Sequence, residues 1–237
     1  DRRPVMKACI DQQSPDVLGT QEGVYSQLKE MSHDLPSYGW IGTGRDGGSR
    51  GEFMAVFYKK KRLEPLEFDH FWLSDTPNLI GSTNWGNTNR RMVTWVRFKD
   101  RATQREFYLM NTHLDHAVVV AREKGSALIR ERANTLGAKL PLLLIGDFNA
   151  EPGKEPTYDI LTADRFFRDA WTEAPVRRHE GFNTFHNFAG PVKGSFRIDW
   201  ILMHGPWRCQ GAEVVLFSRK GQFPSDHHPV TATLRLE

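Results

Sequence analysis

The chain has 237 residues, of which 39% are hydrophobic and 26% are charged, and its formal net charge at pH 7 is +3. This composition excludes an intrinsically disordered chain, and no apolar run approaches the roughly 20 residues that a membrane-spanning helix needs. Cys9 and Cys209 are the only cysteines, which excludes a disulfide framework and a cysteine zinc site. We therefore expect two free, buried thiols in a soluble globular protein whose weak basic bias would tolerate a phosphate-bearing substrate.

The first predicted element is a helix that extends to about Gln13, with Pro4 in its first turn, where proline is favoured. Runs rich in β-branched and aromatic residues follow, and each predicts a strand. These runs are residues 53–58, 92–98, 106–112, 142–146, 197–203 and 230–236. A second helix is predicted over about residues 119–139, from apolar residues at helical spacing. Many strands with few helices predict two packed sheets flanked by helices, in a single domain over residues 1–237.

Two connections carry conspicuous charge. The runs MVTWVRF and EFYLMNT are expected to form a hairpin across the turn KDRATQR. The basic run KKKR at residues 59–62 is expected in another hairpin turn, as a solvated loop rather than a track for phosphates. Arg90 and Arg91 are interpreted in the same way.

Polar clusters stand at the ends of several predicted strands. In LLLIGDFN at residues 142–149, Asp147 and Asn149 leave a buried strand two positions apart, so both side chains can point into one crevice. That geometry suits a metal, a water or a phosphate, although an ordinary Asx turn is an alternative. Similar clusters are LGTQEG at 18–23, NTHLDH at 111–116, RIDWILM at 197–203 and SDHHPV at 225–230. Five such clusters are hard to explain as five separate turns.

The order of these motifs points to a family. QE at 21–22, THLD at 112–115, GDFN at 146–149, RIDW at 197–200 and SDHHP at 225–229 occur in this order. Over nearly its whole length the chain resembles the endonuclease/exonuclease/phosphatase superfamily, the deoxyribonuclease I-like proteins. The segments GRDGG, FWLSDTP and TFH resemble a bacterial branch of metal-dependent hydrolases. The resemblance implies an α/β (α+β) fold, a four-layer sandwich of two packed, mostly antiparallel β-sheets flanked by helices.

One feature departs from the family pattern. The superfamily's first strand normally ends in an Asn that helps to bind the metal, and no Asn precedes Glu22 here. We expect that the sequence begins after that strand, because loss of a central strand would leave unpaired backbone in a buried sheet. A signal peptide removed from such a chain would place the protein in the periplasm or outside the cell, so the compartment stays open.

The resemblance implies a Mg²⁺-dependent phosphoesterase, with Mn²⁺ as a substitute cofactor, that hydrolyses a phosphomonoester or phosphodiester by metal-assisted in-line attack of water. Glu22 and Asp226 would hold the metal, because Mg²⁺ prefers carboxylate oxygens and retains several waters. The implied catalytic residues are His113, Asp147, Asn149, Asp199 and His227.

Each implied catalytic residue has a role. Asp147 would orient or deprotonate the attacking water, and Asn149 would hold the phosphate or that water. Asp199, an acid inside an apolar strand, would pair with His227 and favour its protonated form, which can stabilise a pentacovalent phosphorane. His113 would contact a phosphoryl oxygen.

Five further side chains are candidate substrate contacts: Arg45, Arg50, Asp115, His116 and His186. Arg45 and Arg50 lie in the glycine-rich segment 42–52, which is expected to be a flexible loop near the cleft. Asp115 and His116 extend the THLD motif, and a satisfied loop pair is an equally good interpretation of them.

Two other functions stay open beside the leading one. The first is a catalytically impaired homologue that binds a phosphorylated ligand, and the second is a zinc hydrolase built on His113, His116 and His227. We expect a monomer without a transmembrane segment. Its substrate is expected to be a phosphate ester, and nucleic acid is one candidate. Nucleic acid, sugar phosphate, inositol phosphate and lipid substrates all remain open, because such specificities differ in loops rather than in the shared core.

Overall fold

The computed structural model describes residues 2–237. Its helices are α1 (Arg3–Gln13), α2 (Tyr25–Asp34), α3 (Val119–Gly137), α4 (Pro156–Thr162), a 3-10 turn (Ala163–Arg165) and α5 (Ala170–Glu173). Its strands are β1 (Val17–Val24), β2 (Tyr38–Ile41), β3 (Glu52–Lys59), β4 (Leu63–Trp72), β5 (Met92–Asp100), β6 (Glu106–His113), β7 (Leu142–Asp147), β8 (Arg168–Asp169), β9 (Arg177–Arg178), β10 (Asp199–His204), β11 (Trp207–Val214) and β12 (Val230–Leu236).

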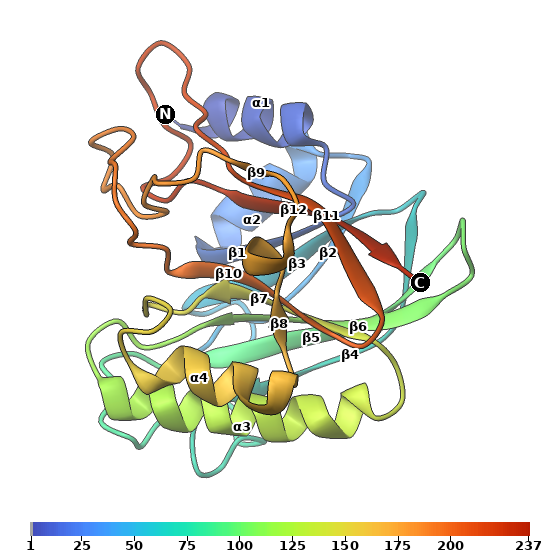
Figure 1. The fold of residues 1–237 in the computed structure, drawn as a ribbon, viewed down its shortest axis with the longest axis vertical. Coiled ribbons are helices and arrows are strands. Elements are labelled where there is room, and N and C mark those ends of the chain that lie inside the picture. The colour runs from blue at the N-terminus through green and yellow to red at the C-terminus, as the bar shows by residue number, and fades with distance from the viewer. Residues whose placement is uncertain (1) are drawn as a thin grey trace.

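The strands form two stacked layers. One layer is a six-stranded sheet of order β4-β5-β6-β7-β10-β8, in which only the β6–β7 pair is parallel. The other layer consists of two three-stranded sheets, β1-β3-β2 and β12-β11-β9. Figure 1 shows α3 and α4 below the sheets and α1 and α2 above them. The predicted four-layer sandwich is therefore confirmed, with one refinement, since the second sheet layer is divided in two.

Burial of strand β7 on both of its faces explains the uninterrupted apolar run at residues 142–145. Leu142 and Leu144 pack toward α3 and α4, whereas Leu143 and Ile145 pack toward the three-stranded sheets. A strand buried on both faces needs apolar side chains at every position rather than at alternate ones. Strand β7 therefore lies in the middle of the molecule, between two hydrophobic clusters. Its carboxyl end lies at the edge of both clusters.

All six predicted strands and both predicted helices occur, as does the hairpin between β5 and β6. The prediction for residues 59–62 is wrong in one respect, because β3 and β4 belong to different sheets and this basic run connects the two layers. Strand β4 escaped prediction because Pro65 and several charged residues interrupt it. It lies at the edge of the six-stranded sheet, where proline and charge are tolerated.

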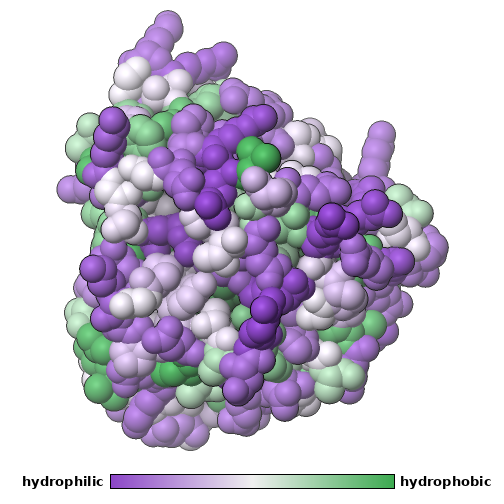
Figure 2. Space-filling model, viewed as in Figure 1, coloured by the Kyte–Doolittle hydropathy of each residue, from purple (hydrophilic) through white to green (hydrophobic). Residues whose placement is uncertain are grey.

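The two three-stranded sheets are not hydrogen-bonded to each other, and their edge strands β1 and β12 border a groove of about 300 Å³. Cys9 and Cys209 are free and buried, as expected. Figure 2 shows a face that is mostly hydrophilic, with small and separate hydrophobic areas. No helix in residues 2–237 is both long and apolar enough to span a bilayer.

Candidate active site

Strand register brings three polar side chains to one edge of the six-stranded sheet. His113 ends β6, Asp147 ends β7, and the two residues are partners in the parallel pairing of these strands. Asp199 begins β10 and lies directly opposite Asp147 in the antiparallel β7–β10 pair. Because neighbouring strands are only about 4.8 Å apart, this register alone places the three side chains within interaction distance.

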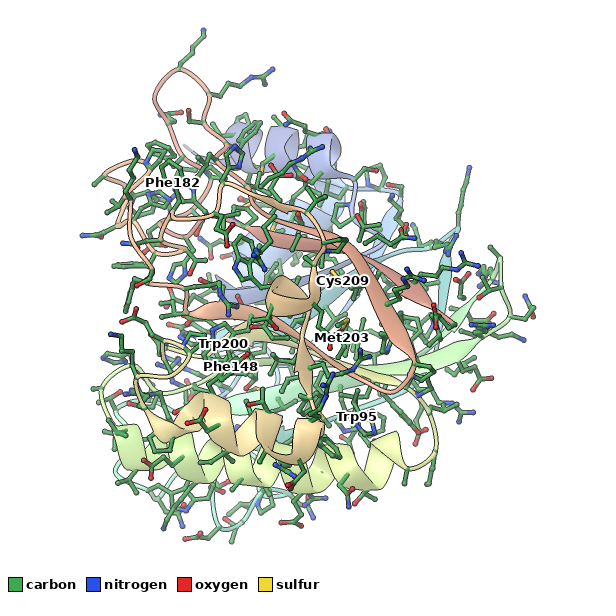
Figure 3. The ribbon with its side chains drawn as sticks, in the orientation of Figure 1. Trp95, Phe148, Phe182, Trp200, Met203 and Cys209 are labelled. Carbon is green, nitrogen blue, oxygen red and sulfur yellow. The ribbon has the colours of Figure 1, made fainter. Side chains whose placement is uncertain are left out.

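Aromatic neighbours fix the direction of the two acids. Phe148 and Trp200, which follow Asp147 and Asp199 in the chain, are buried and stack with ring centroids 4.3 Å apart. Figure 3 shows this pair beside the α3 and α4 layer. Since successive side chains of an extended segment point to opposite faces, burial of the rings on the helix side directs the carboxylates to the other side.

Gly146 allows the close approach of β6 and β7 at the site. Its φ is +154°, and a Cβ atom at this position would lie 2.1 Å from the backbone oxygen of Thr112. Any other residue would push the two strands apart. The glycine of the GDFN motif thus has a steric role in the pairing of His113 with Asp147.

The Asp147 carboxylate is the centre of a hydrogen-bonding network. Its Oδ1 accepts a hydrogen bond from the backbone N–H of Asn149 at 2.9 Å, and its Oδ2 lies 3.3 Å from Nε2 of His113. Asn149 adopts a left-handed backbone conformation with φ of 50°, which asparagine tolerates well, and donates its amide to the backbone oxygen of Leu114. Burial, followed by the nearby charge of Asp199, raises the pKa of Asp147 to about 7.

Asp199 and His227 form the expected hydrogen-bonded pair. Nδ1 of His227 lies 2.9 Å from Oδ2 of Asp199, and its Nε2 lies 3.9 Å from Oδ2 of Asp147. Burial disfavours the charged imidazole, but the Asp199 carboxylate outweighs this effect and raises the pKa of His227 to about 9. In contrast, burial and then the positive charge of Arg91 hold the pKa of His113 well below its usual range. The site therefore pairs one cationic histidine with one neutral histidine at pH 7.

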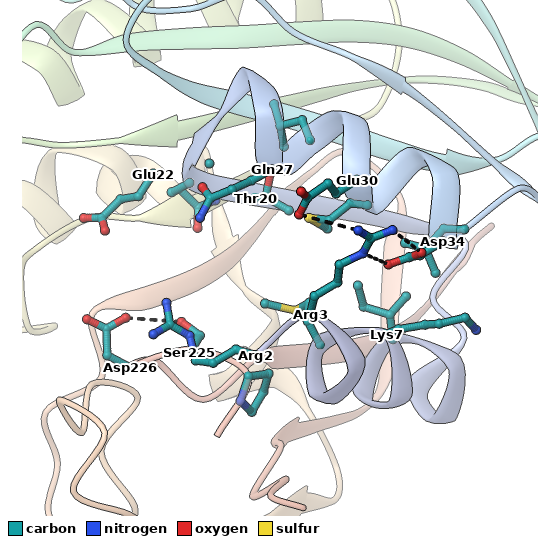
Figure 4. A pocket seen from close by; sticks show the side chains of 18 residues that line it. Arg2, Arg3, Lys7, Thr20, Glu22, Gln27, Glu30, Asp34, Ser225 and Asp226 are labelled. Carbon is teal, nitrogen blue, oxygen red and sulfur yellow. Dashed lines mark hydrogen bonds and ion pairs between the residues drawn. The ribbon is translucent and has the colours of Figure 1, made fainter. Parts of the chain in front are cut away.

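The predicted metal ligands come from a different sheet and a different loop. Glu22 lies in a β-bulge of β1, between Thr20 and Gly23, and has φ of +62°, a strained value for a glutamate. Asp226 lies in the loop before β12. Both residues line the same pocket, and Figure 4 shows their carboxylates on one side of it. A bulge that re-aims a side chain next to a site is common in sheets.

The donor set here suits a hard divalent cation. Among residues 2–237, the exposed Glu22 carboxylate has no hydrogen bond or ion pair, and the Asp226 carboxylate accepts only from Ser225 Oγ, at 3.3 Å. Two carboxylates that line one pocket and make no ion pair within residues 2–237 match the oxygen ligands that Mg²⁺ prefers. Glu22 and Asp226 could thus hold a divalent metal with water as the remaining ligands.

A three-histidine zinc site is not supported by the geometry. Within residues 2–237, one group of three metal-ligating side chains has its ligand atoms within 4.8 Å of one another, and it consists of Asp147, Asp199 and His227. His113 and His116 are not part of that group. The His116 ring instead lies against Thr88, with Nδ1 3.4 Å from the hydroxyl oxygen.

A pocket of about 390 Å³, which we call the central pocket, contains most of the predicted residues. It is lined by Glu22, Arg45, Glu52, Asn89, Arg91, His113, His116, Asp147, Asn149, Phe185, Phe196, Ile198, Asp226 and His227. Of the candidate substrate contacts, Arg45 and His116 therefore reach it. Arg45 is held by Glu52, at 2.5 Å, and by Asn89, at 3.2 Å.

Three other candidate substrate contacts lie elsewhere. Arg50 is exposed and donates to the backbone oxygen of Asp46. The buried Asp115 accepts hydrogen bonds from the backbone of Val118 and from Thr88, so it is the satisfied loop anchor that was the alternative interpretation. His186 is also buried, and its ring stacks on His228 at 4.0 Å between centroids. None of the three side chains lines the central pocket, because Arg50 lies in an exposed loop while Asp115 and His186 are buried among other residues.

Arg91 is the main residue that the sequence interpretation missed. We expected Arg90 and Arg91 to be solvated, but Arg91 is only 2% exposed and lines the central pocket. The one signal in the sequence was its position immediately before the buried strand β5. Asn89 and Glu52 also line the pocket, and neither belongs to a motif that indicated a site.

Comparison with known proteins agrees with the fold and the motifs. The model of the endonuclease/exonuclease/phosphatase family matches residues 6–227, and the chain belongs to this family. Members of the family are phosphoester hydrolases and generally use a divalent metal.

Individual relatives cover different shares of the chain. An uncharacterized protein of Acanthamoeba polyphaga mimivirus, L388, is 25% identical over 71% of this chain, which spans 65% of that protein. Nocturnin of Drosophila melanogaster is 32% identical over 69% of this chain, which spans only 24% of nocturnin. The structure of a mannosyl-6-phosphatase of Bacteroides thetaiotaomicron is similar over 99% of this chain and 90% of that one, with 33% identity and a TM-score of 0.92.

Proposed function

We propose that the protein is a Mg²⁺-dependent phosphoesterase that hydrolyses a phosphate ester by in-line attack of water. The observation that carries this proposal is the central pocket itself. There Asp147, His113 and His227, of which His227 is hydrogen-bonded to Asp199, line the same pocket as Glu22 and Asp226, two carboxylates that make no ion pair within residues 2–237. Hydrolysis of a phosphate ester requires an activated water and neutralisation of charge on the phosphoryl oxygens. The two sides of the pocket supply these two requirements.

Asp147 is the proposed base. Its carboxylate is fixed by the backbone N–H of Asn149, and its pKa of about 7 suits a group that must accept a proton near neutral pH. The amide of Asn149, which lies 3.5 Å from Oδ2 of Asp147, would hold the attacking water or a phosphoryl oxygen.

The histidines are the proposed phosphoryl ligands. His227 is cationic at neutral pH and oriented by Asp199, so its Nε2–H can donate to charge that develops on the phosphorane. His113 stays neutral and can donate from Nε2 while its ring is held by burial. When bound at Glu22 and Asp226, Mg²⁺ would neutralise phosphoryl charge and act as a Lewis acid.

The comparisons guide the choice of first substrates. The similar structure from Bacteroides thetaiotaomicron is named a mannosyl-6-phosphatase, which supports a sugar phosphate as one candidate. The named relative nocturnin supports a phosphate ester more generally. We therefore place mannose 6-phosphate first, beside a generic phosphomonoester and a generic phosphodiester.

The experiment is hydrolysis of p-nitrophenyl phosphate, bis(p-nitrophenyl) phosphate and mannose 6-phosphate with Mg²⁺, Mn²⁺, Zn²⁺ or a chelator. We expect turnover with Mg²⁺ or Mn²⁺ and its loss with the chelator. Binding of inorganic phosphate without turnover of any ester would favour the impaired homologue instead. Full activity with Zn²⁺ alone would contradict the assignment of Mg²⁺.

A further inference from the structure

Arg91 occupies an unusual position in the central pocket. It immediately precedes β5, and its backbone oxygen accepts a hydrogen bond from the N–H of Leu73 at 2.8 Å. This backbone contact fixes the start of its side chain. The side chain then extends beneath the pocket, where it is 3% exposed.

The guanidinium group is buried with most of its donors unused. Nη2 lies 3.3 Å from Nδ1 of His116, and Nε lies 4.0 Å from Oδ2 of Asp115, too far for a hydrogen bond. Nε and Nη1 have no hydrogen-bond partner among residues 2–237. Arg45, the other arginine of the pocket, differs because Glu52 and Asn89 occupy its donors.

Buried cations with free donors are rare, because an arginine pays a large desolvation cost unless an anion compensates it. Asp115 lies within ion-pair distance of Arg91, at 4.0 Å, but its carboxylate accepts hydrogen bonds from the backbone N–H groups of Ala117 and Val118 and from Thr88 instead. The free N–H groups of Arg91 therefore lie at a pocket that already holds His113 and Asp147. A phosphoryl group is an anion whose oxygens could accept hydrogen bonds from these N–H groups.

We propose that Arg91 is a substrate-binding residue that donates through Nε and Nη1 to a terminal phosphoryl group, so that the site selects phosphomonoesters over phosphodiesters. This inference rests on the proposed phosphoesterase function. Arginine presents its N–H donors in a planar fork that matches two oxygens of one phosphate.

The substrate class follows from the number of anionic oxygens. A phosphomonoester has three non-bridging oxygens and carries close to two negative charges at pH 7, whereas a phosphodiester has two such oxygens and one charge. The metal side, the two histidines and Arg91 together provide more donors than a diester can use.

The test compares Arg91→Gln and Arg91→Lys with wild type and with Arg90→Gln. Arg90 is the matched control, because it is the neighbouring arginine, is half-exposed and does not line the pocket. We expect Arg91→Gln to lower kcat/KM for p-nitrophenyl phosphate by about 100-fold or more, the usual cost of one contact to transition-state charge. For bis(p-nitrophenyl) phosphate the loss should be about tenfold or less. Arg91→Lys keeps the buried charge but loses the fork, so monoester activity should stay low while the thermal midpoint recovers.

A second measurement does not depend on turnover. Isothermal titration with inorganic phosphate should show binding to wild type and to Arg90→Gln. The affinity of Arg91→Gln and of Arg91→Lys for phosphate should be at least tenfold weaker. If phosphate binding is weakened as expected but no protein hydrolyses an ester, the subsite stands and the proposed phosphoesterase function fails. If wild type hydrolyses esters but both Arg91 variants bind phosphate normally and lose monoester and diester activity equally, Arg91 is structural and the inference is overturned.

Discussion

The two sides of the central pocket are built in opposite ways. On one side, strand register places His113, Asp147 and Asp199 together, and a hydrogen bond joins Asp199 to His227. On the other side, Glu22 is exposed and has no partner among residues 2–237. In the proposed function, the side that would act on water and phosphate is already connected, whereas the carboxylate side would be completed by a bound cation.

The backbone differs in the same way between the two sides. Asn149 and Glu22 both have positive φ values, 50° and 62°. Asparagine adopts this conformation readily, and its amide makes hydrogen bonds there. Glutamate does not adopt it readily, so the pairing of β1 with β3 on both sides of the bulge must hold Glu22 in a strained conformation. The comparison teaches that hydrogen bonds support the unusual backbone on one side, whereas on the other side the strand pairing alone holds it.

The largest expected effect is on kcat, when residues of the hydrogen-bonded side of the pocket are replaced. Asp147→Ala and His227→Ala should each lower kcat by about 100 to 1000-fold, because each removes a contact to charge that develops in the transition state. The double variant should lie near the worse single one, since residues that serve one step act as a unit. Steady-state kinetics on a verified phosphate ester, with Asp164→Ala as an exposed control, gives the measurement.

Two outcomes would contradict this prediction. Single variants that hydrolyse the ester at the wild-type rate would make both residues structural. A multiplicative loss in the double variant would show that they act in separate steps.

On the carboxylate side, Glu22→Gln should weaken metal dependence. Loss of a residue that only supports a metal ligand typically lowers metal affinity about 10 to 100-fold. Loss of a direct oxygen ligand should therefore raise the Mg²⁺ concentration for half-maximal activity by at least that factor. A Mg²⁺ titration of activity measures this, with Glu123→Gln on α3 as the control. Unchanged Mg²⁺ activation in Glu22→Gln would remove Glu22 from the metal site.

The charge state of His227 can be tested in the metal-free protein. Its imidazole should titrate at about pH 9, and Asp199→Asn should lower this pKa, because burial remains while the compensating carboxylate is lost. Stability from the charged pair is fully present below the ordinary histidine pKa of 6.5 and is lost as the pH rises through about 9. Histidine NMR signals followed from pH 5 to 10 report both values. An unaltered titration in Asp199→Asn would mean that another group holds the proton.

The smallest expected effect is on stability. Glu22→Gly should raise the free energy of unfolding by about 1 kcal/mol, because release of roughly 1–3 kcal/mol of backbone strain exceeds the entropic cost of a glycine, about 0.5–1 kcal/mol. Urea denaturation of the metal-free protein measures the difference. A less stable variant would show that the bulge at Glu22 is not strained.

Part of this site could be predicted from the sequence because its cause is local. Asp147 and Asn149 follow an apolar run, and Asp199 interrupts another, so the strand pattern itself marks their positions. The order of the motifs then predicted the four-layer fold. The division of the second sheet layer and the strand β4 had no comparably regular pattern.

The different burial of Arg90 and Arg91 has no local cause in the sequence. Arg90 and Arg91 are identical neighbours in sequence, yet one makes an ion pair with Asp46 at the surface and the other is buried. The difference arises because the backbone of Leu73, eighteen residues away in the numbering, pairs with Arg91. Contacts over such distances in the chain also bury His186 against His228. A pattern of residue types along the chain carries no information about them.

One buried amide determines how the two halves of the pocket stay aligned. Asn111 of β6 donates to the backbone oxygens of Thr20 and Ala55, at 3.0 and 2.9 Å, and accepts from Gln21 at 2.7 Å. Two apolar faces alone would resist sliding past each other only weakly. Here any shear between the layers would break three hydrogen bonds inside the protein, at a cost of about 1–3 kcal/mol for each buried group left unsatisfied. Glu22 and His113, which flank these bonds on β1 and β6, would therefore keep a constant spacing when a substrate enters between them.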